Sequence, residues 1–237
     1  MIVRDRGDTW QIVLQTDHAE LSGQLARAWA EPVSRSLAIV AERHDDGWAV
    51  WEQAPMVDGG TGRPVNFLEV HVPAHLAFYR AAIAAVSDHD AGAGRLLRMH
   101  GAGIYRQRYG LDPALGLERA AEVQEEVDAF VAEQEAVFGG PPAGDERKQY
   151  ELLQLFDRFS LYFCMRDAES GEEAEVQGYR FEPVAPWHVR LDPYPFAERP
   201  ASFALLRRVL PKRDWGDDEF GEAFFALEPE RVEITIE

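Results

Sequence analysis

The chain of 237 residues has one cysteine, Cys164, and two lysines, Lys148 and Lys212. A single cysteine excludes an internal disulfide framework and any zinc site built from several thiolates. Histidine, aspartate and glutamate are then the residues left to hold a metal ion. Long apolar runs are also missing, since no stretch approaches the roughly 20 residues that a membrane-crossing helix needs. We therefore expect no membrane partner.

Positive charge is scarce as well, with 24 basic residues against 42 acidic ones and a net charge of -18. Such a balance repels phosphate backbones and anionic membranes, so nucleic acid is not an expected partner. Residues 1–6 lead into a charged segment rather than the apolar core of a signal peptide, which predicts a cytoplasmic protein. The 46% of hydrophobic residues is enough to bury a sizeable core.

Apolar residues recur at helical spacing as far as about residue 170, and short strand-like runs follow. The predicted helices begin near Asp17 (with Glu20 completing a capping box), at Pro32, near Pro73 and near Ala91, and then cover 117–138 and 145–165, with a loop at 139–144. The predicted strands are 176–181, 188–191, 203–210, 224–227 and 232–236, and 8–15 is a candidate further strand. The pattern predicts a mainly α fold. Residues 1–170 would form a helical body, and residues 171–237 a small, mostly antiparallel β-rich subdomain packed on it.

Three histidines and one aspartate fall on the apolar faces of predicted helices. His18 precedes Leu21 by three residues, and His44 follows Val40 by four. His100 and Asp157 likewise share the spacing of buried leucines on their own helices. We expect all four side chains to point inward, with Asp45 directly beside His44 at a helix end.

A buried carboxylate without a partner is costly, and a buried imidazole needs partners for both nitrogens. One metal centre would satisfy all of these groups, because divalent zinc, iron, manganese or cobalt accepts imidazole and carboxylate ligands. The alternative is that each histidine is a hydrogen-bonded core residue and Asp157 a paired structural acid.

The order His18, then His44-Asp45-Asp46-Gly47 (HDDG), then Asp157 in LFDRFSL resembles the HD-domain superfamily of metal-dependent phosphohydrolases. The longer segments QTDHAELSGQLARAW, HDDGWAVWEQAP, GRPVNF and LLRMHGAGIY are similar to a bacterial family known as domain of unknown function 3891, over most of the chain. The resemblance implies an HD-domain-like helical bundle in which His18, His44, Asp45 and Asp157 ligate metal. The narrower family brings no reaction with it.

Some HD-domain proteins hold two metal ions, which implies two further ligands between the His-Asp pair and the late aspartate. His100 and His75 are the candidates here, and His71 is a reserve. One or two divalent ions are therefore expected. The side chains nearest in sequence for binding an anionic small-molecule substrate are Arg43, Arg98, Tyr105 and Arg158.

Three functions remain open from these residues. The first is a metal-dependent hydrolase of a small phosphorylated or nucleotide-like molecule, in which Asp45 or Asp46 orients a metal-activated water. The second is a di-iron oxygenase acting on a small polyol or phosphonate, which needs the six-ligand site. The third is a regulatory module that binds metal without turnover. The oligomeric state does not follow from the sequence.

Overall fold

The computed structural model describes residues 1–112, 120–166 and 173–237. Within these ranges the helices are α1 (Gln15–Ala28), α2 (Arg35–Arg43), α3 (Ala49–Glu52), α4 (Val72–His89), α5 (Ala91–Ile104), α6 (Ala121–Phe138), α7 (Gly144–Met165) and α8 (Asp217–Ala226). Short 3-10 turns are η1 (Asp46–Trp48), η2 (Phe67–Glu69) and η3 (Gln107–Gly110). The strands are β1 (Ile2–Asp5), β2 (Thr9–Val13), β3 (Ala174–Val176), β4 (Tyr179–Ala185), β5 (His188–Asp192), β6 (Ala201–Pro211) and β7 (Glu230–Ile236).

All of these strands belong to one mixed sheet in the order β1-β2-β6-β7-β5-β4-β3. Neighbours pair antiparallel except β5 and β7, which are parallel. The strands from the start of the chain enter the sheet through β2, where Trp10 lies opposite Leu210 of β6. The candidate strand at 8–15 is thereby confirmed as β2.

The predicted fold class is wrong. The molecule is an α/β fold with a seven-stranded sheet, not a mainly α HD-domain-like bundle carrying a small C-terminal sheet. The prediction missed β1, which has only four residues, and the union of β2 with β6. Local periodicity carries no information on pairing between segments about 200 residues apart, because register is set by tertiary contacts.

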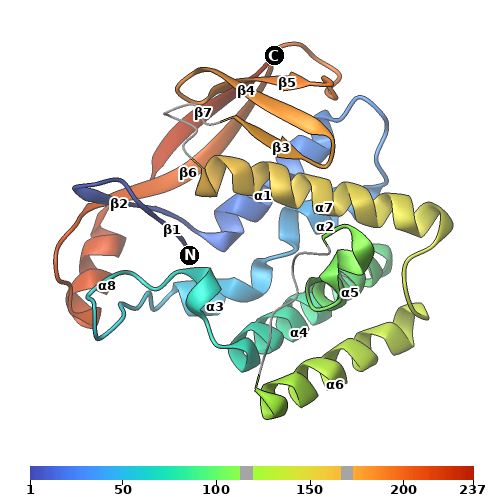
Figure 1. The fold of residues 1–237 in the computed structure, drawn as a ribbon, viewed down its shortest axis with the longest axis horizontal. Helices are drawn as coiled ribbons and strands as arrows, with labels where there is room; N and C mark the ends of the chain where they lie inside the picture. Colours follow the sequence, from blue (N-terminus) through green and yellow to red (C-terminus); the bar gives the residue numbers. More distant parts are fainter. Residues whose placement is uncertain (113–119, 167–172) are drawn as a thin grey trace.

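The sheet lies over α1 and α7, and α4, α5 and α6 lie on the far side of that pair (Figure 1). Helix α1 packs against β6 on one side and α2 and α7 on the others, so its buried residues include polar as well as apolar ones. Helix α5 is similarly enclosed by α2, α4, α6 and α7. Side chains from α1, α5 and α7 therefore meet in the interior.

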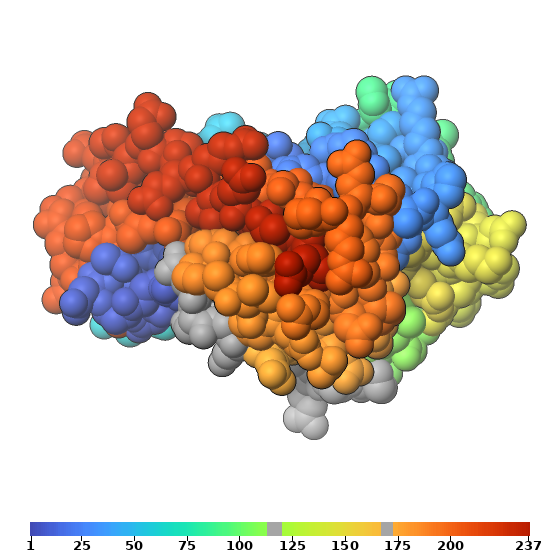
Figure 2. All heavy atoms as spheres, turned by 90° about the horizontal axis from the view of Figure 1, so that it is seen from above, coloured from blue at the N-terminus to red at the C-terminus, as the bar shows by residue number. Residues whose placement is uncertain are grey.

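A second, smaller core covers the outer face of β2 and β6. Trp10 and Ile12 of β2 and Leu210 of β6 pack there against Phe220 and Phe224 of α8. Viewed from above, the N-terminal residues adjoin the C-terminal chain on one face of the molecule (Figure 2). The strand predicted at 224–227 is wrong, since Phe224 belongs to α8 and a short apolar run fits a buried helix turn equally well.

Three of the observed helix starts agree closely with the predicted ones, and two differ. Helices α4, α5 and α7 begin within one residue of the predicted positions, and Pro73 lies in the first turn of α4 as expected. Helix α1 begins at Gln15, so Asp17 lies inside its first turn and does not cap it. Helix α2 is capped by Ser34, whose Oγ accepts from the Leu37 amide, and Pro32 precedes the helix.

Two predicted features lie outside the described residues. They are the start of the helix predicted over 117–138 and the domain boundary near residue 170. No helix among the described residues has the length and apolar character to cross a membrane.

Candidate metal centre

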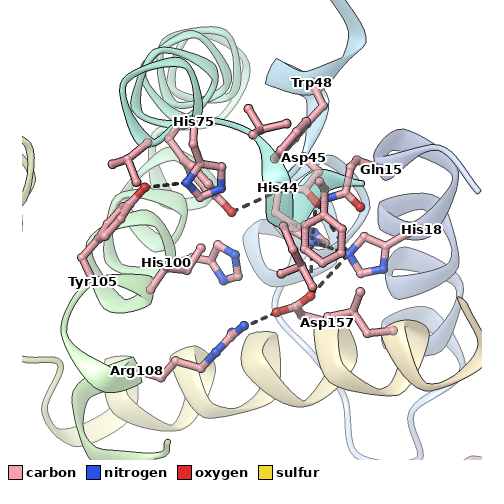
Figure 3. A pocket seen from close by; sticks show the side chains of 17 residues that line it. Gln15, His18, His44, Asp45, Trp48, His75, His100, Tyr105, Arg108 and Asp157 are labelled. Carbon is pink, nitrogen blue, oxygen red and sulfur yellow. Dashed lines mark hydrogen bonds and ion pairs between the residues drawn. The ribbon is translucent and has the colours of Figure 1, made fainter. Parts of the chain in front are cut away.

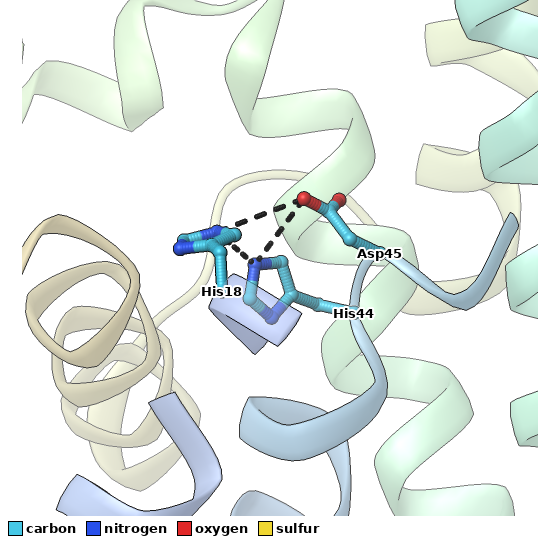
Figure 4. A group of neighbouring side chains, drawn as sticks. All are labelled: His18, His44 and Asp45. Carbon is cyan, nitrogen blue, oxygen red and sulfur yellow. Dashed lines mark hydrogen bonds and ion pairs between the residues drawn. The ribbon is translucent and has the colours of Figure 1, made fainter. Parts of the chain in front are cut away.

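Four buried side chains from three helices meet beneath the sheet. His18 lies in the first turn of α1, His44 caps the end of α2 with Asp45 directly after it, and Asp157 lies on the inner face of α7. Each is at most 5% exposed. Figure 4 shows His18, His44 and Asp45 pointing toward one another, and Figure 3 shows Asp157 beside them.

The donor atoms of these side chains lie within 4 Å of their neighbours in the cluster. His18 Nε2 lies 3.1 Å from His44 Nε2, and both nitrogens lie 3.7 Å from Asp45 Oδ2. Asp157 Oδ1 lies 3.3 Å from His18 Nε2 and 3.7 Å from His44 Nε2. Several of these separations are too long for good hydrogen bonds. Ligands about 2.1 Å from a metal lie roughly 3.0 to 3.4 Å apart, so two of these five distances match a metal-bound set and the three of 3.7 Å are slightly longer. His18, His44 and Asp45 form a group that could hold a metal ion, and Asp157 lies next to this group without belonging to it.

Hydrogen bonds on the far side of each ring direct both Nε2 atoms into the cluster. His44 Nδ1 donates to the Ala41 carbonyl oxygen at 3.0 Å. Ser160 Oγ donates to the Asp157 carbonyl oxygen at 2.8 Å, so it accepts from His18 Nδ1 at 2.6 Å. A metal ion that displaced the proton between these rings would meet Nε2 as the ligand atom, since backbone and hydroxyl partners at Nδ1 commonly orient metal-bound imidazoles in this way.

Gly47 allows the segment that carries Asp45 to pack closely against helix α4. A Cβ built on Gly47 would lie 1.9 Å from the Phe78 carbonyl oxygen, so η1 runs directly against the backbone of α4. Tyr79, the next residue of α4, donates its hydroxyl to Asp45 Oδ1 at 3.3 Å. The glycine of the HDDG segment thus permits the close approach that brings α4 to the carboxylate.

The charges in the cluster depend on one another. Burial disfavours protonation of His44, but the carboxylates of Asp45 and Asp157 raise its pKa to about 9. Burial would raise the pKa of Asp157, but Arg108 and the two imidazoles hold it well below its usual value. Burial raises the pKa of Asp45. The carboxylates therefore hold a positive charge between them, as either a proton or a metal ion.

A pocket of about 240 Å³ opens beside the four side chains (Figure 3). Its polar wall includes the cluster together with His75, Tyr79, His100, Tyr105 and Arg108. Its apolar wall is formed by Trp48, Phe67, Leu68, Val70, Val72, Ile104 and Leu161. Small molecules can therefore reach the Nε2 atoms from one side.

His75 and His100 line the same pocket, but neither belongs to the group of potential metal ligands. His75 Nδ1 is hydrogen-bonded to the Tyr105 hydroxyl, and burial lowers the pKa of His75 to about 4. His100 Nδ1 lies 2.8 Å from Gln154 Nε2. Among the described residues, His18, His44 and Asp45 form a set of three donor side chains with ligand atoms within 4.8 Å of one another, and His75 and His100 complete no second set.

The remaining predicted residues divide between the pocket and other surfaces. Tyr105 lines the pocket. Asp46 pairs with Arg43, with 2.7 Å between Oδ2 and Nε, on another side of η1. Arg98 Nη1 donates to Gln134 Oε1, and Arg158 Nη2 donates to Asp112 Oδ2, both outside the pocket.

Sequence reasoning missed Arg108, Gln154, Ser160 and Tyr79 as parts of the site. Ser160 follows Asp157 by three residues and Tyr79 follows His75 by four, so helical spacing could have placed both near the pocket. Arg108 lies beyond the end of α5, so the helical spacing of apolar residues gives no information on its direction.

Comparison with known protein families gives one match. The family model described as protein of unknown function (DUF3891) matches residues 1–212. The chain belongs to the DUF3891 family. The matched segment runs from β1 to the end of β6, so it includes His18, His44, Asp45 and Asp157. No curated protein and no solved structure matches the chain. The HD-domain resemblance therefore rests on the order of His18, His44-Asp45 and Asp157 alone.

Proposed function

We propose that this DUF3891 protein is a metal-dependent hydrolase that acts on a small phosphorylated substrate. The observation that supports the proposal is the convergence of two imidazole Nε2 atoms and two carboxylates at the edge of a pocket. Two imidazoles and two carboxylates suit zinc, iron, manganese or cobalt. The order of the ligands along the chain is that of HD-domain phosphohydrolases, although the fold is not.

His18, His44, Asp45 and Asp157 would hold the ion. When bound, a divalent cation supplies Lewis acidity and lowers the pKa of water. Asp45 has one oxygen directed at the imidazoles and the other fixed by Tyr79, so its carboxylate is positioned to orient an attacking water. His75 stays neutral at physiological pH and faces the pocket, where its ring can hydrogen-bond a water or a leaving oxygen.

One ion fits better than two. A second ion would need lone pairs from His75 and His100, and His100 Nδ1 already accepts from Gln154. The oxygenase alternative depends on a binuclear site, so this hydrogen bond favours hydrolysis. Asp46 is paired with Arg43 outside the pocket, which leaves Asp45 as the acid for the water-orienting role.

Elemental analysis of Asp45→Ala beside Asp46→Ala tests the proposal. The two acids are adjacent, but only Asp45 lies within reach of the imidazoles. We expect about one equivalent of transition metal in the native protein and in Asp46→Ala, with little in Asp45→Ala. Hydrolysis of 4-nitrophenyl phosphate should follow metal content across the three proteins. Native protein that takes up no metal from zinc, manganese, iron or cobalt solutions would refute the proposal.

A further inference from the structure

Arg108 reaches the pocket from an unusual backbone turn. Gln107, Arg108 and Tyr109 have φ angles of 51°, 49° and 50°, and Gly110 continues the left-handed path at 89°. Left-handed conformations are unfavourable for residues other than glycine, because the Cβ atom crowds the neighbouring carbonyl oxygen. Such strain persists where surrounding contacts over-determine it, and it is common at ligand sites.

The contacts of Arg108 leave part of its guanidinium unused. Nη1 donates to Asp157 Oδ2 at 2.9 Å and to Gln154 Oε1. Nε is buried and has no acceptor. The side chain is only 12% exposed, so the unused donor is withheld from bulk water as well. Arg108 nevertheless lines the pocket, so the exposed part of its side chain and its permanent positive charge act on a ligand there.

Gln154 also determines which proton His100 carries. The Gln154 oxygen accepts from Arg108, which can only donate, so the Gln154 amide nitrogen must face His100 Nδ1. The neutral His100 ring then carries its hydrogen on Nε2. Figure 3 shows this ring projecting from α5 into the pocket, near Arg108. His100 therefore offers the pocket a hydrogen-bond donor and not a metal ligand.

The rest of the pocket limits the ligand's size and polarity. Its volume of about 240 Å³ lies below the roughly 300–1,000 Å³ of sites for drug-sized molecules. Phe67, Leu68 and Ile104 are among the apolar side chains that line it. A ligand that satisfies both walls is small, with an oxyanion at one end and an apolar body at the other.

We propose that Arg108 and His100 bind the phosphoryl group of the substrate, and that the substrate is a compact phosphomonoester with an apolar body rather than a nucleotide. This inference rests on the proposed hydrolase function. The protein as a whole is negatively charged, but the permanent positive charge of Arg108 and a cation bound at the cluster would together create a local positive potential that attracts an anion. Guanidinium groups are well suited to phosphate oxygens.

The test measures the affinity for inorganic phosphate by calorimetry in Arg108→Met, Arg108→Lys and His100→Phe. Arg158→Met is the matched control, because Arg158 is a similarly buried arginine that is paired with Asp112 outside the pocket. Each protein is titrated both manganese-loaded and after chelation, and its metal content is measured separately. We expect phosphate affinity to fall about 10- to 100-fold in Arg108→Met, less in the lysine variant, and not at all in Arg158→Met.

The outcomes separate this inference from the proposed function. Native affinity for phosphate in both Arg108→Met and His100→Phe overturns the inference, and hydrolysis by the metal-loaded protein would still stand. Tighter binding of acetate than of phosphate overturns the phosphoryl assignment. Faster hydrolysis of adenosine monophosphate than of phenyl phosphate overturns the compact apolar substrate. If Arg108→Met folds poorly, His100→Phe and Arg108→Lys carry the same comparison.

Discussion

His18 Nδ1 and Ser160 Oγ lie 2.6 Å apart, and the serine hydroxyl in turn donates to the Asp157 carbonyl oxygen. This pair links α1 to α7 and sets the ring orientation of one proposed ligand. Ser160 therefore orients a proposed metal ligand although it does not itself line the pocket.

Ser160→Ala should weaken metal binding about 10- to 100-fold, because the His18 ring loses the partner that fixes its tautomer. Competition with a metal-chelating dye measures the change. Ser36→Ala is the control, since Ser36 bonds Asp90 at the other end of α2. Equal metal affinity in Ser160→Ala and native protein would contradict this role.

Metal-free protein should lose stability as pH rises from about 6.5 to 9. The raised pKa of His44 means that its proton is bound more tightly in the folded state, so the stabilisation is complete below the unfolded pKa. The contribution is about 3 kcal/mol and is lost as pH passes through the folded value. Urea unfolding of chelated protein at pH 6.5 and 9 measures it.

His44→Asn removes the titrating group and should flatten this dependence. Metal-loaded protein should also lack it, because the ion takes the place of the proton. A chelated native protein that is equally stable at both pH values would argue against a proton shared by His44 and the carboxylates.

Gly47→Ala should destabilise the protein by at least about 1–3 kcal/mol, because the added methyl meets the Phe78 carbonyl oxygen. Denaturant midpoints give the change. Gly59→Ala is the control, since no heavy atom lies within 4 Å of its added Cβ. Equal midpoints for the two variants would show that η1 and α4 can separate freely.

Gln107→Gly should leave stability unchanged or raise it by up to about 1 kcal/mol. Relief of the left-handed conformation outweighs the extra freedom of glycine in the unfolded chain. Ala129→Gly, at an exposed position inside α6, should instead cost about 1 kcal/mol. Equal losses in thermal unfolding would show that residue 107 is not under strain.

Helical periodicity was sufficient to predict that His18, His44 and Asp157 point inward, because side-chain direction along a helix follows from spacing alone. It could not say which inward side chains share a cavity. His75 and His100 point into the same pocket as the cluster, yet hydrogen bonds to Tyr105 and Gln154 set them apart.

The pairing of the sheet and the position of Arg108 could not be predicted from local sequence patterns, for two different reasons. Pairing of β2 with β6 depends on contacts between opposite ends of the chain. The turn that delivers Arg108 contradicts the preferences of Gln107 and Tyr109, since only Gly110 favours a positive φ. Sequence rules fail where tertiary contacts impose a conformation that the residues themselves disfavour.

The pairing of β2 with β6 also governs how the protein can be made. Each proposed ligand lies before residue 158, yet β2, which leads directly into α1, has only β1 as a partner strand until residues 208–211 of β6 have been synthesised. A nascent chain that has emerged from the ribosome as far as α7 would contain all four proposed ligand residues. Trp10 and Ile12 would still lack the residues of β6 and α8 that bury them. Any metal bound during translation would thus meet an incomplete scaffold, and shortened fragments that expose these strands should aggregate.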